Sequence, residues 1–82
     1  KPSYFSVFPS PASNQILVQF QPKVSQYPYD YTIYDSTGRS VLKGKIYTDK
    51  TAIDISSLSN SWYQIQISDN NQLIDYKQFV KN

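Results

Sequence analysis

The chain contains no cysteine, no histidine and no glutamate among its 82 residues. Without cysteine it can form neither a disulfide nor a thiolate metal site. Without histidine it lacks the side chain that most often serves as a general base and as a zinc ligand. Its carboxylate side chains come from six aspartates: Asp30, Asp35, Asp49, Asp54, Asp69 and Asp75. Most enzymes and structural metal centres depend on the missing residues, so we expect no metal and no cofactor.

Positive charge and long apolar runs are also scarce. The net charge is +2, and only Arg39, Lys43 and Lys45 cluster. A nucleic-acid-binding domain usually carries a dense basic face, so we expect no nucleic-acid partner. The longest aliphatic run is Ile16–Val18, far shorter than the roughly 20 residues of a membrane helix. No long apolar region follows Lys1, so we expect no secretory signal here and interpret the chain as a piece of a longer protein or a mature product.

Tyrosine and small polar residues are abundant instead. Eight tyrosines, four phenylalanines and one tryptophan accompany many serine, asparagine, glutamine and threonine residues, a mixture that suits an extracytoplasmic bacterial β-domain. Apolar and polar residues alternate in segments that recur about every ten residues, which favours a sandwich or a barrel. A sandwich fits best, because two half-polar sheets hide their apolar faces against each other. We predict one all-β domain, residues 1–82, of about seven antiparallel strands: Tyr4–Phe8, Gln15–Phe20, Tyr29–Asp35, Ser40–Tyr47, Thr51–Ile55, Trp62–Ser68 and Gln72–Val80.

Glycine and proline mark special positions between and within these strands. Gly38 predicts a turn at Asp35–Arg39, which joins the strands on either side into a hairpin. Gly44, inside the return strand, predicts a bulge or a close approach of another group. The prolines of Pro9–Pro11 predict an extended segment that pairs poorly with a neighbour. Residues 1–8 are then a linker or a first edge strand, and an exposed edge there is able to pair with a second copy of the chain.

No catalytic arrangement is evident in the sequence. Neither a serine–lysine nor a glycine–serine nucleophile motif is present. Asp54 and Asp75 are candidates for a carboxylate pair of the glycosidase kind, but their alternation with apolar neighbours fits solvated strand faces better. Asp69–Asn71 is a candidate calcium loop, but its single carboxylate fits a hairpin turn better. We therefore expect no enzyme.

Exposed aromatic residues offer a second kind of function, carbohydrate binding. Trp62 lies on the polar face of its predicted strand, together with Gln64 and Gln66, and sugars stack on such rings. The alternative is that Trp62 covers one end of the core and that the tyrosines pack across strands. The tyrosines in question surround Pro28: Tyr27, Tyr29 and Tyr31.

Four ordered stretches give the chain its family resemblance: "VFPSPASNQILVQF", "YTIYDSTGRSVLKGKI", "TAIDISSLSNSWYQIQIS" and "LIDYKQFVKN". They resemble the C-terminal sorting domain of the type IX (Por) secretion system, type A. That family shows a Pro-Asn-Pro-Ala opening, a D-x-x-G-R/K turn, an I/D-I/L-S-x-L-x-x-G-x-Y segment and a terminal strand with lysine and apolar residues. The motifs fall on Pro9–Ala12, Asp35–Arg39, Asp54–Tyr63 and Lys77–Lys81.

Two positions depart from the family pattern. Ser10 stands between the prolines where asparagine is usual, and Ser61 stands where glycine is usual, two residues before Tyr63. If a left-handed residue is needed at that turn, we expect Asn60 to supply it, because asparagine tolerates that conformation. The departures raise the question of whether the domain is processed as an ordinary cargo signal.

The resemblance implies an immunoglobulin-like sandwich at the end of a larger secreted protein of a Bacteroidetes-type bacterium. It implies passage through the periplasm and recognition by an outer-membrane translocon, with a shuttle protein, a sortase and anionic lipopolysaccharide as further partners. The protein is then expected at the outer membrane and cell surface, or secreted. The alternatives are a retained domain of the surface machinery, a carbohydrate-binding module and a passive fibronectin type III spacer.

Two groups of residues follow from the resemblance. The residues expected to meet the machinery are Asp35, Gly38, Arg39, Lys77, Phe79, Val80 and Lys81. The terminal strand is suited to this role because it can add to the edge of a partner's sheet. The residues expected to maintain the family structure are Pro9, Pro11, Ala12, Leu58 and Tyr63.

Overall fold

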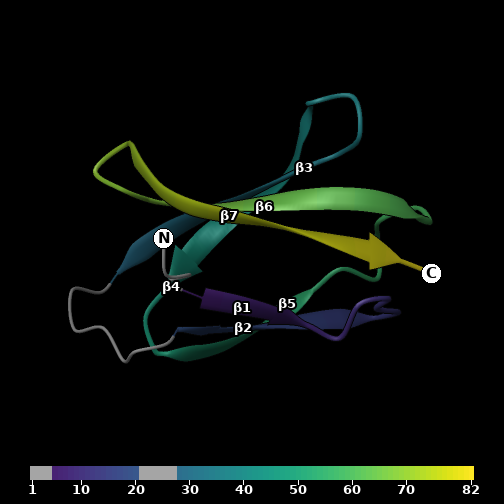
Figure 1. Ribbon diagram of the computed structural model, residues 1–82, viewed down its shortest axis with the longest axis horizontal. Helices are drawn as coiled ribbons and strands as arrows, with labels where there is room; N and C mark the ends of the chain where they lie inside the picture. The colour runs from purple at the N-terminus through teal and green to yellow at the C-terminus, as the bar shows by residue number, and fades with distance from the viewer. Residues whose placement is uncertain (1–4, 21–27) are drawn as a thin grey trace.

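The computed structural model of the chain describes residues 5–20 and 28–82. Its segments of alternating apolar and polar residues form β-strands. The strands are β1 (Phe5–Phe8), β2 (Gln15–Phe20), β3 (Tyr29–Tyr34), β4 (Ser40–Ile46), β5 (Lys50–Asp54), β6 (Ser61–Asp69) and β7 (Gln72–Lys81). They form a three-stranded sheet in the order β1-β2-β5 and a four-stranded sheet in the order β4-β3-β6-β7, and the two sheets face each other (Figure 1). All named strand pairs are antiparallel. The predicted all-β sandwich is confirmed.

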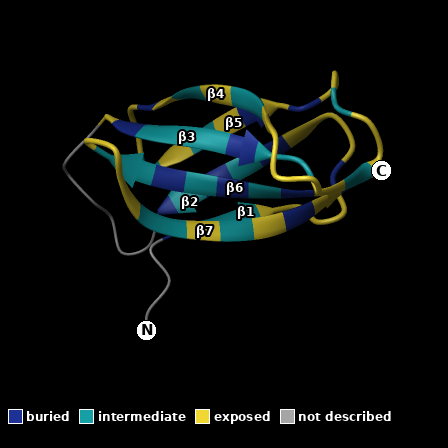
Figure 2. Ribbon diagram, turned by 90° about the horizontal axis from the view of Figure 1, so that it is seen from above, coloured by how far each residue is buried: buried dark blue, intermediate teal, exposed yellow. Residues whose placement is uncertain are grey.

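The core lies between the sheets and is filled by every second residue of the strands. On β6, Tyr63, Ile65 and Ile67 are buried, whereas Trp62 and Gln64 face the opposite side. Along the strands in Figure 2, buried segments are interspersed with intermediate and exposed ones. The fully buried aliphatic side chains come from both sheets: Ile16, Val18, Ile33, Ile46, Ile55, Ile65 and Ile67. Their branched Cβ atoms suit a pleated, buried surface.

The strand boundaries agree closely with those expected from the sequence. Gln15–Phe20 is reproduced to the residue, and the others differ by one residue at one or both ends. Residues Phe5–Phe8 form an edge strand of the smaller sheet, paired with β2, which favours the strand over the linker for this part of residues 1–8. The predictions for Tyr4 and for the segment 21–27 lie outside the described residues.

The two prolines near the start lie where the chain leaves one sheet and reaches the other. β1 ends at Phe8, and Ala12 then forms a parallel bridge to Lys81 at the end of β7. The Ala12 amide donates to the Val80 carbonyl at 2.7 Å, and the Asn82 amide donates to the Ala12 carbonyl at 2.8 Å. Pro9–Ala12 therefore joins the edge strands of the two sheets. We call this contact the terminal clasp.

Ser10 takes part in the terminal clasp through its side chain. Its hydroxyl oxygen accepts a hydrogen bond from the Val80 amide at 3.1 Å. Proline has no amide hydrogen, so this segment pairs with β7 through Ala12 and through the Ser10 side chain. Ala12, just beyond the prolines, is thus paired within the chain, and pairing of a second copy with the edge at residues 1–8 stays a prediction.

Gly44 is required by a close approach, one of the two alternatives that the sequence left open. It lies directly opposite Tyr31 in the β3–β4 ladder. A Cβ atom at Gly44 would lie 2.6 Å from the Tyr31 ring, which packs against the core. The irregularity in this hairpin lies elsewhere, between Ile33 and Tyr34.

Tyr63 forms a hydrogen bond that anchors the start of β6. Its ring is buried and its hydroxyl donates to the Ser59 carbonyl at 2.6 Å. A tyrosine near the start of this strand that bonds back to the preceding corner is a hallmark of immunoglobulin-like sandwiches. Leu58, in the same corner, packs against the core.

The left-handed residues lie in a different turn from the one expected. Asn70 and Asn71, between β6 and β7, have φ values of 52° and 67°. Two such residues form a two-residue hairpin loop, for which asparagine is favoured. Asn60 and Ser61 are not among the residues with positive φ, so the expectation for Asn60 is wrong. Ser61 begins β6 in an ordinary strand conformation, and glycine is not needed there.

Replacing Gly44 by alanine tests the close approach of Tyr31. We expect Gly44→Ala to lower the free energy of unfolding by about 1 kcal/mol or more, because the ring must move out of its packed position. In a Tyr31→Ala background the same change should be neutral or stabilising, because glycine inside a strand otherwise costs about 0.5–1 kcal/mol relative to alanine. Urea denaturation of the parent chain, the two single variants and the double variant gives the double-mutant cycle. Equal effects of Gly44→Ala in both backgrounds would contradict the contact.

Removing the Tyr63 hydroxyl tests the anchor at the start of β6. We expect Tyr63→Phe to lower the free energy of unfolding by about 1–2 kcal/mol, because the Ser59 carbonyl loses its donor while the ring stays packed. Tyr47→Phe is the matched control, since Tyr47 is an exposed tyrosine. Both are measured by urea denaturation, and equal stabilities of the two variants would refute the role of this hydrogen bond.

Candidate functional site

The four family motifs, which are distant in sequence, meet at one end of the sandwich. β3 ends and β4 begins there, at the Asp35–Arg39 turn, and β5 ends there before the corner that leads to β6. Ser61 at the start of β6 pairs with Lys81 at the end of β7. The terminal clasp places Pro9–Ala12 beside the same end of β7. We call this region the motif end.

The Asp35–Arg39 turn is organised by a single carboxylate. Oδ1 of Asp35 accepts hydrogen bonds from the Thr37 hydroxyl at 2.6 Å, the Thr37 amide at 2.9 Å and the Arg39 amide at 3.0 Å. Gly38 has a φ of 89°, a conformation that glycine adopts without the steric cost of a Cβ atom. Asp35 and Gly38 therefore shape the turn.

The charge of Asp35 is stabilised by these contacts. The Thr37 hydroxyl, then the backbone amide of Arg39, hold the pKa of the Asp35 carboxyl at about 2, below its ordinary value of 3.8. The guanidinium of Arg39 adds an ion pair of 3.4 Å, while the Arg39 side chain stays 80% exposed. Arg39 is thus a charged residue of the turn that a partner can reach.

A second aspartate organises the neighbouring corner after β5. Oδ1 of Asp54 accepts a hydrogen bond from the Ser56 amide at 2.9 Å, and this bond lowers the pKa of the Asp54 carboxyl. The Leu58 amide donates to the Ile55 carbonyl at 3.0 Å and closes the turn. The I/D-I/L-S-x-L motif therefore encodes a corner that ends with Tyr63.

The predicted recognition residues of β7 differ in accessibility. Phe79 is 1% exposed and stacks on Tyr63 with ring centroids 5.7 Å apart. Lys81 is also buried, at 9%, whereas Val80 is 41% exposed. Lys77 is partly exposed and lies two residues before Phe79 on β7, opposite Ile65. A partner that docks on the folded domain reaches Val80 and Lys77 but not the Phe79 ring.

The residues expected to maintain the family structure divide in the same way. Ala12 and Tyr63 are buried, and Leu58 is partly buried against the core. Pro9 and Pro11 are exposed and flank the serine that bonds to β7. All five lie at the motif end.

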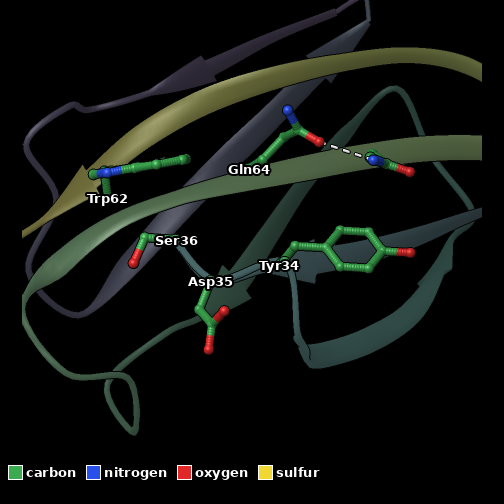
Figure 3. Close-up of a pocket in the computed structure, with 7 residues that line it drawn as sticks. Tyr34, Asp35, Ser36, Trp62 and Gln64 are labelled. Atoms are coloured by element: carbon green, nitrogen blue, oxygen red, sulfur yellow. Dashed lines mark hydrogen bonds between the residues drawn. The ribbon is translucent and has the colours of Figure 1, made fainter.

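A groove on the outer face of the larger sheet opens beside the Asp35–Arg39 turn. It has a volume of about 420 Å³ and is lined by Tyr34, Asp35, Ser36, Gly38, Trp62, Gln64 and Gln66. Trp62 lies on β6, directly opposite Val80 on β7. Figure 3 shows Trp62 at one end of the groove, with Gln64 farther along the same strand and Tyr34 on the neighbouring strand. Alternation along β6 predicts the polar-face position of Trp62, and this is confirmed.

The tyrosines that the sequence offered for sugar stacking do not line this groove. Tyr29 is buried and stacks on Phe20, and the Tyr31 ring lies over Gly44 on the core side of the sheet. Burial raises the pKa of both hydroxyls. Tyr27 lies outside the described residues. Tyr34, which sequence reasoning missed, shares the outer face because it lies opposite Gln64.

Within residues 5–20 and 28–82, no three or more histidine, cysteine, aspartate or glutamate side chains gather as a metal site would require. The same residues include no helix long and apolar enough to cross a membrane. The candidate carboxylates Asp54 and Asp75 instead accept hydrogen bonds from nearby backbone amides.

The low pKa of Asp35 predicts a pH-dependent stability. The group titrates near 3.8 when unfolded and near 2 when folded, so its stabilising contribution is complete above about pH 4 and is lost as the pH falls toward 2. We expect Asp35→Asn to be less stable than the parent chain at neutral pH, with the difference shrinking as the pH approaches 2. Urea denaturation across this range measures it. A difference that stays constant with pH would contradict the charge-based role.

Comparison with known proteins agrees with the geometry of the motif end. No curated protein matches the chain. The model of the family described as secretion system C-terminal sorting domain matches residues 6–82. This match includes the terminal clasp, the Asp35–Arg39 turn, the corner before β6 and the whole of β7. The chain therefore belongs to the family of C-terminal sorting domains of the type IX secretion system.

Proposed function

We propose that this domain is the signal by which the type IX machinery carries a larger protein across the outer membrane and attaches it to the cell surface. In this proposal the protein crosses the periplasm, and the domain itself is a ligand of the translocon rather than an enzyme. A shuttle protein, a sortase and anionic lipopolysaccharide are the further partners. The family match over residues 6–82 carries the proposal.

The motif end is the surface that we propose the machinery recognises. The four motif segments lie together at this end of the sandwich. The exposed residues of this surface include Arg39, Val80 and the two prolines, Pro9 and Pro11, and Lys77 extends it along β7. Phe79 and Lys81 contribute from the inside, since their burial fixes the course of the strand that presents Val80.

The outer edge of β7 offers a further mode of contact. The Val80 amide and carbonyl point away from β6, toward Ser10 and Ala12. Residues two and four positions earlier, Gln78 and Tyr76, direct their backbone groups to the same side in a regular strand. The Tyr76 amide bonds to the Asp75 carboxylate at 2.8 Å. A partner strand can pair with this edge next to the terminal clasp.

A pair of matched charge changes tests the recognition surface. The domain is fused behind a periplasmic reporter in a bacterium that has the type IX system, and surface-exposed reporter is measured. We expect Arg39→Glu and Val80→Asp to weaken recognition about tenfold each, the effect of losing about 1.4 kcal/mol at an interface. The controls are Lys50→Glu and Leu73→Asp, which make the same changes at exposed residues of the opposite end.

The possible outcomes distinguish a failure of the proposed sorting function from a failure of the proposed recognition surface. If the unaltered domain fails to bring the reporter to the surface, the proposed function is wrong. If all four variants are exported equally well, the signal holds but its placement at the motif end is wrong. Deleting Phe79–Asn82 is a poorer test, because loss of the buried Phe79 ring disrupts the core. Cleavage of the exported fusion distinguishes a processed signal from a retained domain.

A further inference from the structure

The groove beside Trp62 lies on the outer face of the larger sheet and takes no part in packing the core. Its floor is the outer face of β3 and β6, and the inner face of the same strands is filled by Ile33, Ile65 and Ile67. Side chains on a sheet that is packed on its other face are held in place before any ligand arrives. Trp62 nevertheless keeps 46% of its surface in contact with solvent. The groove is therefore a formed surface with an exposed aromatic ring.

Two amide side chains lie along the groove in a defined orientation. Nε2 of Gln66 donates a hydrogen bond to Oε1 of Gln64 at 2.8 Å (Figure 3). This bond leaves the Gln64 amide nitrogen as a donor and the Gln66 carbonyl oxygen as an acceptor. The two residues alternate with core residues on β6, so both amides project from the same face. The groove thus offers the amide donors of Gln64 and the carbonyl acceptor of Gln66.

The groove carries little charge that would select an ionic ligand. Asp35 is its charged lining residue, and its carboxylate already accepts three hydrogen bonds within the turn and pairs with Arg39. No lysine or arginine lines the groove among the described residues. A phosphate-bearing or sulfated ligand would find no cation there. The electrostatics therefore match an uncharged ligand.

We propose that this groove binds a neutral oligosaccharide. The face of an aromatic ring carries partial negative charge, and the C–H groups of a sugar ring carry partial positive charge, so the two stack. Sugar hydroxyls can both donate and accept, which suits the two free amide groups and the hydroxyls of Tyr34 and Ser36. From Trp62 to Gln66 the strand extends about 13 Å, enough for a short oligosaccharide.

A protein partner fits this groove less well. Stable protein interfaces bury at least about 1,000 Å² and have an apolar centre. The outer face carries three large exposed side chains, Trp62, Val80 and Tyr76. Around them it continues with polar residues of β3 and β6, and with the Lys45–Asp30 ion pair of 2.7 Å. A volume of about 420 Å³ lies in the range of small-ligand sites, about 300–1,000 Å³. The proposal does not depend on the proposed sorting function.

Trp62 makes the proposal directly measurable, because it is the one tryptophan of the chain. The 82-residue chain is titrated with cellohexaose, laminarihexaose, maltohexaose and mannohexaose while Trp62 fluorescence is followed. We expect a saturable change with at least one of them. Gln66→Ala should weaken that binding about tenfold, since the site loses its acceptor and the orientation of Gln64. Tyr47→Ala, at an exposed aromatic residue outside the groove lining, should bind as the parent does.

The Trp62→Ala variant has no tryptophan fluorescence, so its binding is measured by calorimetry. Trp62→Ala should abolish the heat of binding, while urea denaturation confirms that this half-exposed position leaves the fold intact. A flat response to all four oligosaccharides overturns the proposal. Equal affinity of Trp62→Ala and the parent chain also overturns it, because the ligand would then lie elsewhere. Salt-sensitive binding of dextran sulfate with no binding of the neutral sugars would show an anionic ligand and would refute the proposed chemistry.

Discussion

The inner faces of the two sheets pack against each other in one apolar core. The position of the turns and of the outward-facing side chains depends on this packing. A chain of 82 residues buries only about 60% of the surface that its unfolded form exposes. The strands contribute alternate residues to this buried core. The remaining residues of each strand then face solvent as a set, as Trp62, Gln64 and Gln66 do on β6. The core therefore determines which side chains are available for binding, even though it takes no part in binding itself.

The motif end shows how family motifs can serve structure and recognition together. The carboxylate of Asp35 and the conformation of Gly38 shape one turn, and Tyr63 fastens the next corner. These residues hold Arg39 and Val80 at the surface. The departure at Ser10 also has a structural account, because a serine hydroxyl accepts the Val80 amide hydrogen bond. An asparagine side chain has a carbonyl oxygen for the same purpose.

Local pattern predicts the strands well because side-chain alternation is a property of neighbouring residues. Gln15–Phe20 and the Asp35–Arg39 turn were accessible in this way. The parallel bridge of Ala12 to Lys81 was not, because it depends on the path of the whole chain. For Tyr29 and Tyr31 the sequence left open sugar stacking and cross-strand packing, and both side chains prove to face the core from β3. The groove likewise combines β3 with β6, and only the sheet order reveals it.

The terminal clasp has a consequence for the order in which the domain assembles. It joins Ala12 to the end of β7, so nearly the whole chain lies in the loop that this contact closes. Contacts across such long loops carry the greatest entropic cost and form after local hairpins. We infer that the edge strands of the two sheets are joined only after β7 has paired with β6. The clasp therefore closes only after β7, the last strand, has been synthesised.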